Sequence, residues 1–220
     1  LPVVTTLHGT DITLVGKHPS YKPAVTFSIN KSDVVTSVSE SLKKDTLSSF
    51  VIKSEIDVVP NFIDIDLYNI EDQCDRSQIA PNNEKKVIHI SNMRPVKRIR
   101  DVIEIFHRIA QEEDVILLML GDGPERERAE QQVRDIGIAE KVRFLGKTRE
   151  VRRLLCMSDL FLLTSEKESF GLVALEAMAA KVPVISTNSG GIPEVNIHGV
   201  TGYLASAGAV EELAAHGLSL

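Results

Sequence analysis

The chain has 220 residues, of which 43% are hydrophobic and 25% are charged, and its net charge is −6. This length and composition suit one large or two smaller globular domains, with enough chain to bury a core. The sequence has no basic tail or stripe that would indicate a nucleic-acid partner. It also has no run of about 18 apolar residues, the length needed to insert stably in a membrane. The two cysteines, Cys74 and Cys156, predict no disulfide framework, so we expect a reducing, cytoplasmic location.

The two ends of the sequence fall inside predicted elements. Leu1 opens almost directly into a strand, and the last residues continue a helical pattern. We therefore expect a piece of a longer chain, cut at both ends.

The first sixty residues alternate between strand and helix patterns. The predicted strands are 2–7, 33–38 and 56–59, and the predicted helices are 19–31 and 39–50, the second with Ser39 as its N-cap. This order is typical of an α/β sheet. Residues 64–85 are polar and show little periodicity. We therefore predict a boundary between a first domain, 1–62, and a second domain, 63–220.

A second α/β series follows this boundary. Its predicted strands are 86–91, 115–120, 142–146, 159–163, 183–186 and 202–204; its predicted helices are 102–110, 125–135, 151–157 and 172–179, with a last helix from 210. Ligands bind beyond the carboxyl ends of parallel strands in such sheets. The loops at those ends are 8–11, 91–97, 121–124, 146–147, 164–171 and 189–194.

The loop before residue 172 carries the strongest functional signal. It joins an apolar strand to a helix, so free backbone N–H groups and a positive helix end meet there and could hold a phosphate. Glu168 lies in the loop and Glu176 lies in the first two turns of the helix. Both carboxylates could face one crevice. The alternative is a solvated helix start, where acids suit the helix dipole.

Two further loops are weaker signals. Arg94 and Lys97 follow a strand, and a diphosphate needs such cations in a cleft where water screens them little. The alternative is a basic surface turn. Gly121-Asp122-Gly123-Pro124 is interpreted as the end of a strand and the start of a helix.

Glu168 and Glu176, with Ser169-Phe170-Gly171 after the first acid, resemble the signature of the retaining nucleotide-sugar glycosyltransferases of family 4. The resemblance implies an α/β fold of the GT-B type, with two Rossmann-like domains facing across a cleft. It implies that Glu168 lies by the donor sugar and that Glu176 binds the ribose hydroxyls. The backbone amides of Phe170, Gly171 and Leu172 would hold the sugar and the diphosphate.

The resemblance assigns further residues on both sides of the cleft. Lys97 matches a diphosphate-binding lysine. The family's arginine lies five positions earlier, where this chain has Asn92, so Arg94 is expected to substitute for it. Gly146 joins the donor side. His8, in His-Gly-Thr-Asp, would lie near the reacting sugar carbon. Thr6 and Thr10 would face the acceptor, and no metal or cofactor is expected.

Four stretches resemble a narrower subgroup of the family: 7–13, 61–64, 89–98 and 165–172. That subgroup transfers N-acetylglucosamine from UDP-N-acetylglucosamine to L-malate, in the first step of bacillithiol synthesis. The expected partners are these two substrates, and homo-oligomers are left open. Because malate is an anion, its site should offer cations or N–H groups.

Two other readings remain. One is the same chemistry with another acceptor, such as a lipid-linked sugar or another small hydroxy compound. The other is a nucleotide-sugar-binding protein without turnover, with a periplasmic-type binding protein as a competitor at the level of the fold. Retention of Glu168 and Lys97 favours an enzyme.

Overall fold

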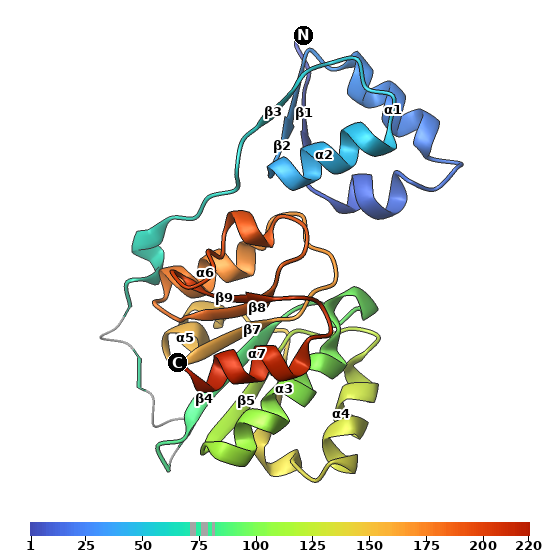
Figure 1. Cartoon of the computed structure of the whole chain (residues 1–220). Coiled ribbons are helices and arrows are strands. Elements are labelled where there is room, and N and C mark those ends of the chain that lie inside the picture. Colours follow the sequence, from blue (N-terminus) through green and yellow to red (C-terminus); the bar gives the residue numbers. More distant parts are fainter. Residues whose placement is uncertain (71–73, 76–78, 81) are drawn as a thin grey trace. The chain divides into compact units, whose positions relative to one another are not determined.

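The computed structural model of the chain describes residues 1–70, 74–75, 79–80 and 82–220 (Figure 1). These residues form two compact units, each described here by itself. The first contains Leu1–Phe62, Glu168–Leu172 and Gly190–Val195; the second contains Ile63–Lys167, Val173–Ser189 and Asn196–Leu220. The domain boundary predicted between residues 62 and 63 stays a prediction.

The first unit contains a three-stranded parallel sheet of order β1-β2-β3. Its elements are β1 (Val4–Leu7), η1 (Asp11–Val15), α1 (Lys22–Lys31), β2 (Val34–Ser37), α2 (Glu40–Ser49) and β3 (Ile56–Val58). Leu7, Val35 and Ile56 are buried, one from each strand. The predicted N-cap of α2 is confirmed, because the Ser39 hydroxyl accepts a hydrogen bond of 3.0 Å from the Leu42 N–H.

The second unit contains a six-stranded parallel sheet of order β6-β5-β4-β7-β8-β9. Its strands are β4 (Lys85–Ile90), β5 (Val115–Leu120), β6 (Val142–Gly146), β7 (Leu160–Leu163), β8 (Val184–Thr187) and β9 (Gly202–Ala205). Every residue of β5, β7 and β8 is buried. Strands covered on both faces favour continuous apolar runs, and β5 and β7 are such runs.

Helices separate the strands of the second unit. They are α3 (Ile99–Glu112), α4 (Arg126–Asp135), α5 (Val151–Cys156), α6 (Leu172–Ala179) and α7 (Val210–Leu218), with the short 3-10 turns η2 (Ile65–Tyr68), η5 (Pro95–Lys97) and η6 (Ala139–Lys141). A further 3-10 turn, η7 (Ile192–Glu194), belongs to the first unit. The predicted helix 102–110 is therefore longer at both ends. Among the described residues, no helix is long and apolar enough to cross a membrane.

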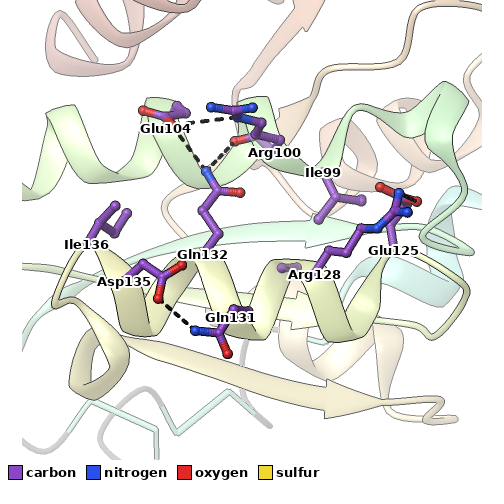
Figure 2. A pocket seen from close by; sticks show the side chains of 10 residues that line it. Ile99, Arg100, Glu104, Glu125, Arg128, Gln131, Gln132, Asp135 and Ile136 are labelled. Carbon is purple, nitrogen blue, oxygen red and sulfur yellow. Dashed lines mark hydrogen bonds and ion pairs between the residues drawn. The ribbon is translucent and has the colours of Figure 1, made fainter.

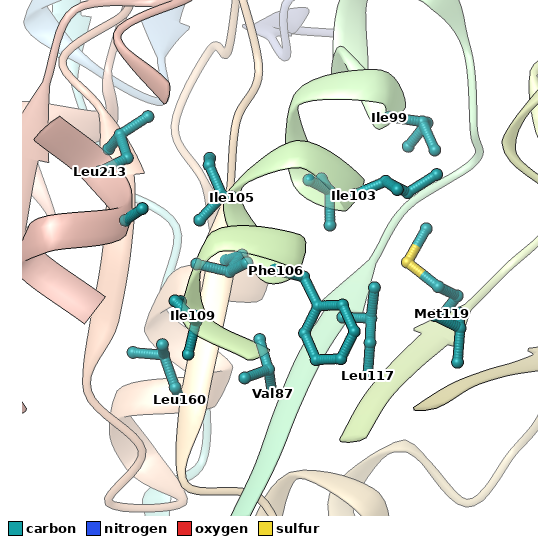
Figure 3. Packing of buried hydrophobic residues seen from close by; sticks show 14 of the residues in the cluster. Val87, Ile99, Ile103, Ile105, Phe106, Ile109, Leu117, Met119, Leu160 and Leu213 are labelled. Atoms are coloured by element: carbon teal, nitrogen blue, oxygen red, sulfur yellow. The ribbon is translucent and has the colours of Figure 1, made fainter. Parts of the chain in front are cut away.

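The core of the second unit lies where α3 and α7 cover the sheet (Figure 3). Phe106 of α3 has no exposed surface and lies beside Leu117 of the sheet, and Leu213 of α7 belongs to the same buried cluster on the side of Ile105. Arg108 of α3 also donates to Glu211 of α7 at 3.0 Å. The amphipathic pattern of α3 thus fixes which face of the helix packs on the sheet.

The order of the strands reverses at β4. The chain runs outward from β4 to β6, returns to place β7 on the other side of β4, and continues to β9. The β4–β5 pairing extends to Ile90 and Leu120. The β4–β7 pairing covers only Val87 with Leu160 and Ile88 with Phe161. The carboxyl ends of β4 and β7 therefore form the topological switch point, where open α/β sheets bind ligands.

Cys74 and Cys156 are joined in a disulfide, with Cα atoms 6.1 Å apart. The expectation of no disulfide is corrected here. The two residues are 82 positions apart in sequence. They meet because the fold brings the end of α5 beside the segment that precedes β4, a proximity that cysteine spacing alone does not reveal.

A glycine lets two loops touch at the carboxyl edge of the sheet. Gly121 follows β5 with φ of +106°, and a Cβ on it would lie 1.8 Å from the Ser91 carbonyl oxygen after β4. Gly123 is similarly close to the Asn92 carbonyl, at 2.0 Å. The Gly-x-Gly-Pro turn therefore does more than end a strand. It packs on the backbone of residues 91–98, called the basic loop because they include Arg94, Lys97 and Arg98.

Gly121→Ala should destabilise the second unit by more than about 2 kcal/mol, because a backbone clash adds to the strain of a left-handed alanine. Gly137→Ala is the matched control: its φ is +74°, and no atom lies within 4 Å of an added Cβ. It should cost only about 1 kcal/mol. Urea unfolding of both variants measures the difference. Equal losses would show that the contact with Ser91 is not restrictive.

Candidate functional site

The loop after β4 carries the predicted diphosphate cations and is tied to the end of β7. The Thr164 hydroxyl donates to the Lys97 carbonyl at 2.8 Å, and the Glu166 N–H donates to the Val96 carbonyl at 2.8 Å. On its other side, the Glu125 N–H donates to the Met93 carbonyl at 2.9 Å. The backbone under Arg94 and Lys97 is thus held from two neighbouring loops.

The three cations of this loop differ in their surroundings. Arg98 donates to Asp101 at 2.6 Å, and that hydrogen bond raises the pKa of its guanidinium. Arg94 is exposed and Lys97 is half-buried; among the described residues, Arg94 has no ion pair. Arg98 is therefore committed to the first turn of α3, and Arg94 is the exposed cation of this loop that could contact an anionic ligand.

His89, in the strand that precedes this loop, connects the start of the loop to β7. It is fully buried in β4. Its Nδ1 lies 2.9 Å from the Leu162 carbonyl oxygen, and its Nε2 lies 2.8 Å from the Ser91 hydroxyl. Burial lowers the pKa of the imidazole to about 4, so the ring is neutral at pH 7. Sequence reasoning assigned no role to His89. A polar residue inside an apolar strand must find partners, and that signal could have marked it.

The β7–α6 loop provides the predicted sugar and phosphate contacts. Phe170 and Gly171 are buried, whereas Leu172, the first residue of α6, is 39% exposed. The Glu168 carbonyl accepts from the Gly191 N–H at 2.9 Å. A Cβ on Gly190, where φ is +61°, would lie 1.9 Å from that carbonyl oxygen. The two glycines after β8 therefore support the loop that carries Glu168.

Glu176 lies in the second turn of α6 and is half-buried. Burial raises the pKa of its carboxyl group, and a hydrogen bond with the Tyr68 hydroxyl opposes that rise. Burial also raises the pKa of Tyr68. The turn that carries Tyr68 is fixed to α5, because Arg152 donates to the Leu67 carbonyl at 3.2 Å. Sequence reasoning missed Tyr68, since its proximity to α6 depends on the tertiary fold.

Gly146 ends β6 with φ of +65°. Its carbonyl accepts from the Gly121 N–H at 2.8 Å. The ends of β5 and β6 are therefore joined beside the loop that carries Lys97. Within the second unit, the fold thus fixes the loops of Arg94, Lys97 and Gly146 to one another.

The predicted acceptor-side residues lie in the first unit. Thr6 in β1 accepts a hydrogen bond of 2.9 Å from the Thr36 hydroxyl. His8 and Thr10, in the loop after β1, are exposed. The Gly9 N–H donates to the Asp11 carboxylate at 2.7 Å, so Asp11 caps the loop. His8 and Thr10 could therefore contact a ligand, whereas the Thr6 hydroxyl is already bonded to Thr36.

A groove of about 580 Å³ lies between α3 and α4 and contains none of the predicted site residues (Figure 2). Its polar groups largely satisfy one another. Gln132 donates to Glu104 at 3.2 Å, and Arg128 pairs with Glu125 at 3.1 Å. We therefore place the candidate site at the strand ends rather than in this groove.

Comparison with known proteins gives the family. Residues 71–220 match the family model described as glycosyl transferases group 1, and residues 1–67 match that of glycosyltransferase family 4. The chain is 50% identical over 210 residues to N-acetyl-alpha-D-glucosaminyl L-malate synthase of Bacillus anthracis, covering 94% of this chain and 55% of the relative. It is 30% identical to the uncharacterized glycosyltransferase MJ1607 of Methanocaldococcus jannaschii, covering 92% and 55%. The chain thus spans about half the length of these relatives.

Solved structures agree with this placement. Anabaena Alr3699/HepE in complex with UDP and glucose superposes with a TM-score of 0.86 and 27% identity, over 97% of this chain and 60% of that one. Staphylococcus aureus TarM gives a TM-score of 0.81 at 24% identity, over 99% and 43%, and shows the fold alone. These neighbours confirm the predicted α/β fold of the GT-B type. Because the first family model covers more than half of the chain, the chain belongs to the group 1 glycosyl transferases.

Proposed function

We propose that the full-length protein is a retaining glycosyltransferase that moves N-acetylglucosamine from UDP-N-acetylglucosamine to L-malate. The observation that carries this proposal is the 50% identity to the L-malate synthase of Bacillus anthracis over 94% of this chain. Glu168 and Lys97 in the loops after β7 and β4, and Glu176 in α6, support it.

In the proposed reaction, the bond between the anomeric carbon and the phosphate oxygen breaks, and its electron pair leaves with UDP. Negative charge grows on the diphosphate as the sugar becomes oxocarbenium-like. Lys97, Arg94 and the amides near Gly171 would stabilise that charge. Preorganised donors of this kind are each worth roughly 3–4 kcal/mol in an active site.

The acceptor hydroxyl oxygen then bonds to the same face of the anomeric carbon, and its proton passes to the departing phosphate. No protein general base is needed for this balance. Glu168 would orient the sugar hydroxyls, Glu176 would bind the ribose hydroxyls, and His8 would contact the sugar. Thr6 and Thr10 would face malate. The proposed reaction uses no metal, since protein cations and N–H groups neutralise the diphosphate.

A cytoplasmic location is part of the same proposal, because it would place the enzyme with its nucleotide-sugar donor. The Cys74–Cys156 disulfide gives no support to that location, since disulfides are rare in a reducing cytoplasm.

The full-length protein should release UDP from UDP-N-acetylglucosamine only when L-malate is present, and release should persist in EDTA. The product should have the mass of N-acetylglucosaminyl malate. Other hydroxy acids and a reaction without acceptor are the controls. Release with another acceptor would keep the glycosyltransferase and exclude malate. UDP binding without release from any sugar nucleotide would favour a binding protein.

Glu176→Ala should weaken UDP binding about 10- to 100-fold, because hydrogen bonds between a carboxylate and the ribose hydroxyls would be lost. Calorimetric titration of the full-length protein measures the change. Glu127→Ala is the control, an exposed acid in the first turn of α4. An unchanged dissociation constant in Glu176→Ala would contradict the assigned role.

Lys97→Ala should lower turnover by about 100-fold and donor affinity by less, because its charge acts mainly on the leaving diphosphate. Lys85→Ala provides the comparison, since Lys85 is an exposed lysine at the opposite end of β4. Steady-state kinetics with varied donor separate the two effects. Equal kcat values in wild type and Lys97→Ala would remove Lys97 from the mechanism.

A further inference from the structure

His89 occupies the point where β4 and β7 separate. The backbone pairing of these strands covers Ile88 with Phe161 and is not continued at the next residues. There the imidazole bonds to the Leu162 carbonyl at 2.9 Å. The ring therefore joins the two strands at the switch point, beyond the last backbone pair.

The partners of the ring fix its tautomer. A carbonyl oxygen only accepts hydrogen bonds, so Nδ1 carries the proton and donates to Leu162. Nε2 must then accept from the Ser91 hydroxyl, at 2.8 Å. The Ser91 oxygen in turn accepts from the Met93 N–H at 3.1 Å. One chain of hydrogen bonds thus runs from β7 through His89 and Ser91 to the backbone of the basic loop.

This chain ends at an unusual backbone position. Met93 has a positive φ of 39° and is fully buried. A non-glycine residue holds such a conformation only when its surroundings enforce it. The hydrogen bond from Met93 to Ser91 is one such constraint, and it lies directly before Arg94. It therefore acts on the direction in which the backbone presents Arg94 and Lys97.

The neutral ring suits this role. A protonated imidazole would place a second cation near Lys97, whose charge already disfavours protonation of His89. Because the ring is fully buried, protonation would also cost desolvation. The hydrogen-bond pattern consequently stays fixed at pH 7, where the proposed reaction is expected to run.

We propose that His89 and Ser91 are positioning residues that fix the basic loop for a diphosphate through a neutral imidazole protonated at Nδ1. This rests on the proposed function, in which Lys97 and Arg94 contact the diphosphate of the donor. The predicted consequence is selective: the contacts to the diphosphate depend on the hydrogen-bond chain, whereas those to the nucleoside do not.

The test is Ser91→Ala in the full-length protein, with UDP and UMP as ligands in calorimetric titrations. UDP binding should weaken about 3- to 10-fold, the effect of one lost hydrogen bond, and UMP binding should change less. Ser158→Ala is the matched control, a buried serine whose hydroxyl donates to the Leu154 carbonyl at 2.7 Å before β7 begins. It should leave the ratio of UMP to UDP dissociation constants unchanged. Equal weakening of both ligands in Ser91→Ala would overturn the proposal.

A double-mutant comparison with Lys97→Ala distinguishes a positioning role of Ser91 from an effect on overall stability. In a Lys97→Ala background, Ser91→Ala should weaken UDP binding much less than in the wild type, because the cation it positions is gone. Ser91→Thr retains the hydroxyl and should restore most of the affinity. Full additivity of the two substitutions would contradict the inference.

The tautomer gives a readout that does not depend on activity. In ¹⁵N-labelled protein at pH 7, His89 should show a protonated Nδ1 and an unprotonated Nε2. The reverse pattern would overturn the proposal. If Lys97→Ala leaves UDP binding and turnover intact, the diphosphate role proposed for Lys97 fails instead. If Lys97→Ala impairs them and Ser91→Ala does not, only the positioning role fails.

Discussion

The separation of β4 from β7 is the constraint on which the candidate site depends. A parallel sheet that reverses its strand order must let two neighbouring chains leave in opposite directions, and here they leave toward α3 and α6. The carbonyl and amide groups at the diverging ends still need partners. His89, Thr164 and the Glu166 N–H supply them. The same contacts hold the loop that carries Lys97.

Backbone contacts rather than ion pairs build this edge of the sheet. Gly121 and Gly123 allow the loop after β5 to touch the loop after β4, and Gly121 also bonds to Gly146. Such contacts use no side-chain charge. Among the cations of the basic loop, Arg98 is bonded to Asp101, whereas Arg94 is exposed. Rigid backbone and available charge are the two requirements of a preorganised anion site.

The parts of the molecule that follow local rules were predictable from sequence. A continuous apolar run predicts the buried strand β5, and a helical spacing of apolar residues predicts α3. The capping chemistry of serine predicts Ser39 as an N-cap. Partners that are distant in sequence were not predictable. His89 bonds to Leu162, Tyr68 to Glu176, and Cys74 to Cys156. Each pair exists because parallel strands and their crossovers bring remote segments together, and no spacing in the sequence encodes that proximity.

Sequence and structure together bear on which arginine could replace the family's diphosphate-binding arginine. The family pattern places an arginine at position 92, where this chain has asparagine. Sequence reasoning chose Arg94 because it lies two residues after Asn92. The structure adds that Arg98 adopts a left-handed conformation and bonds to Asp101, so its guanidinium completes the start of α3. Arg94 follows the constrained Met93 and is exposed. Arg98 is bonded to Asp101 at the start of α3, whereas Arg94 follows a fixed turn and is exposed. Arg94 is therefore the better candidate to substitute for the family's arginine.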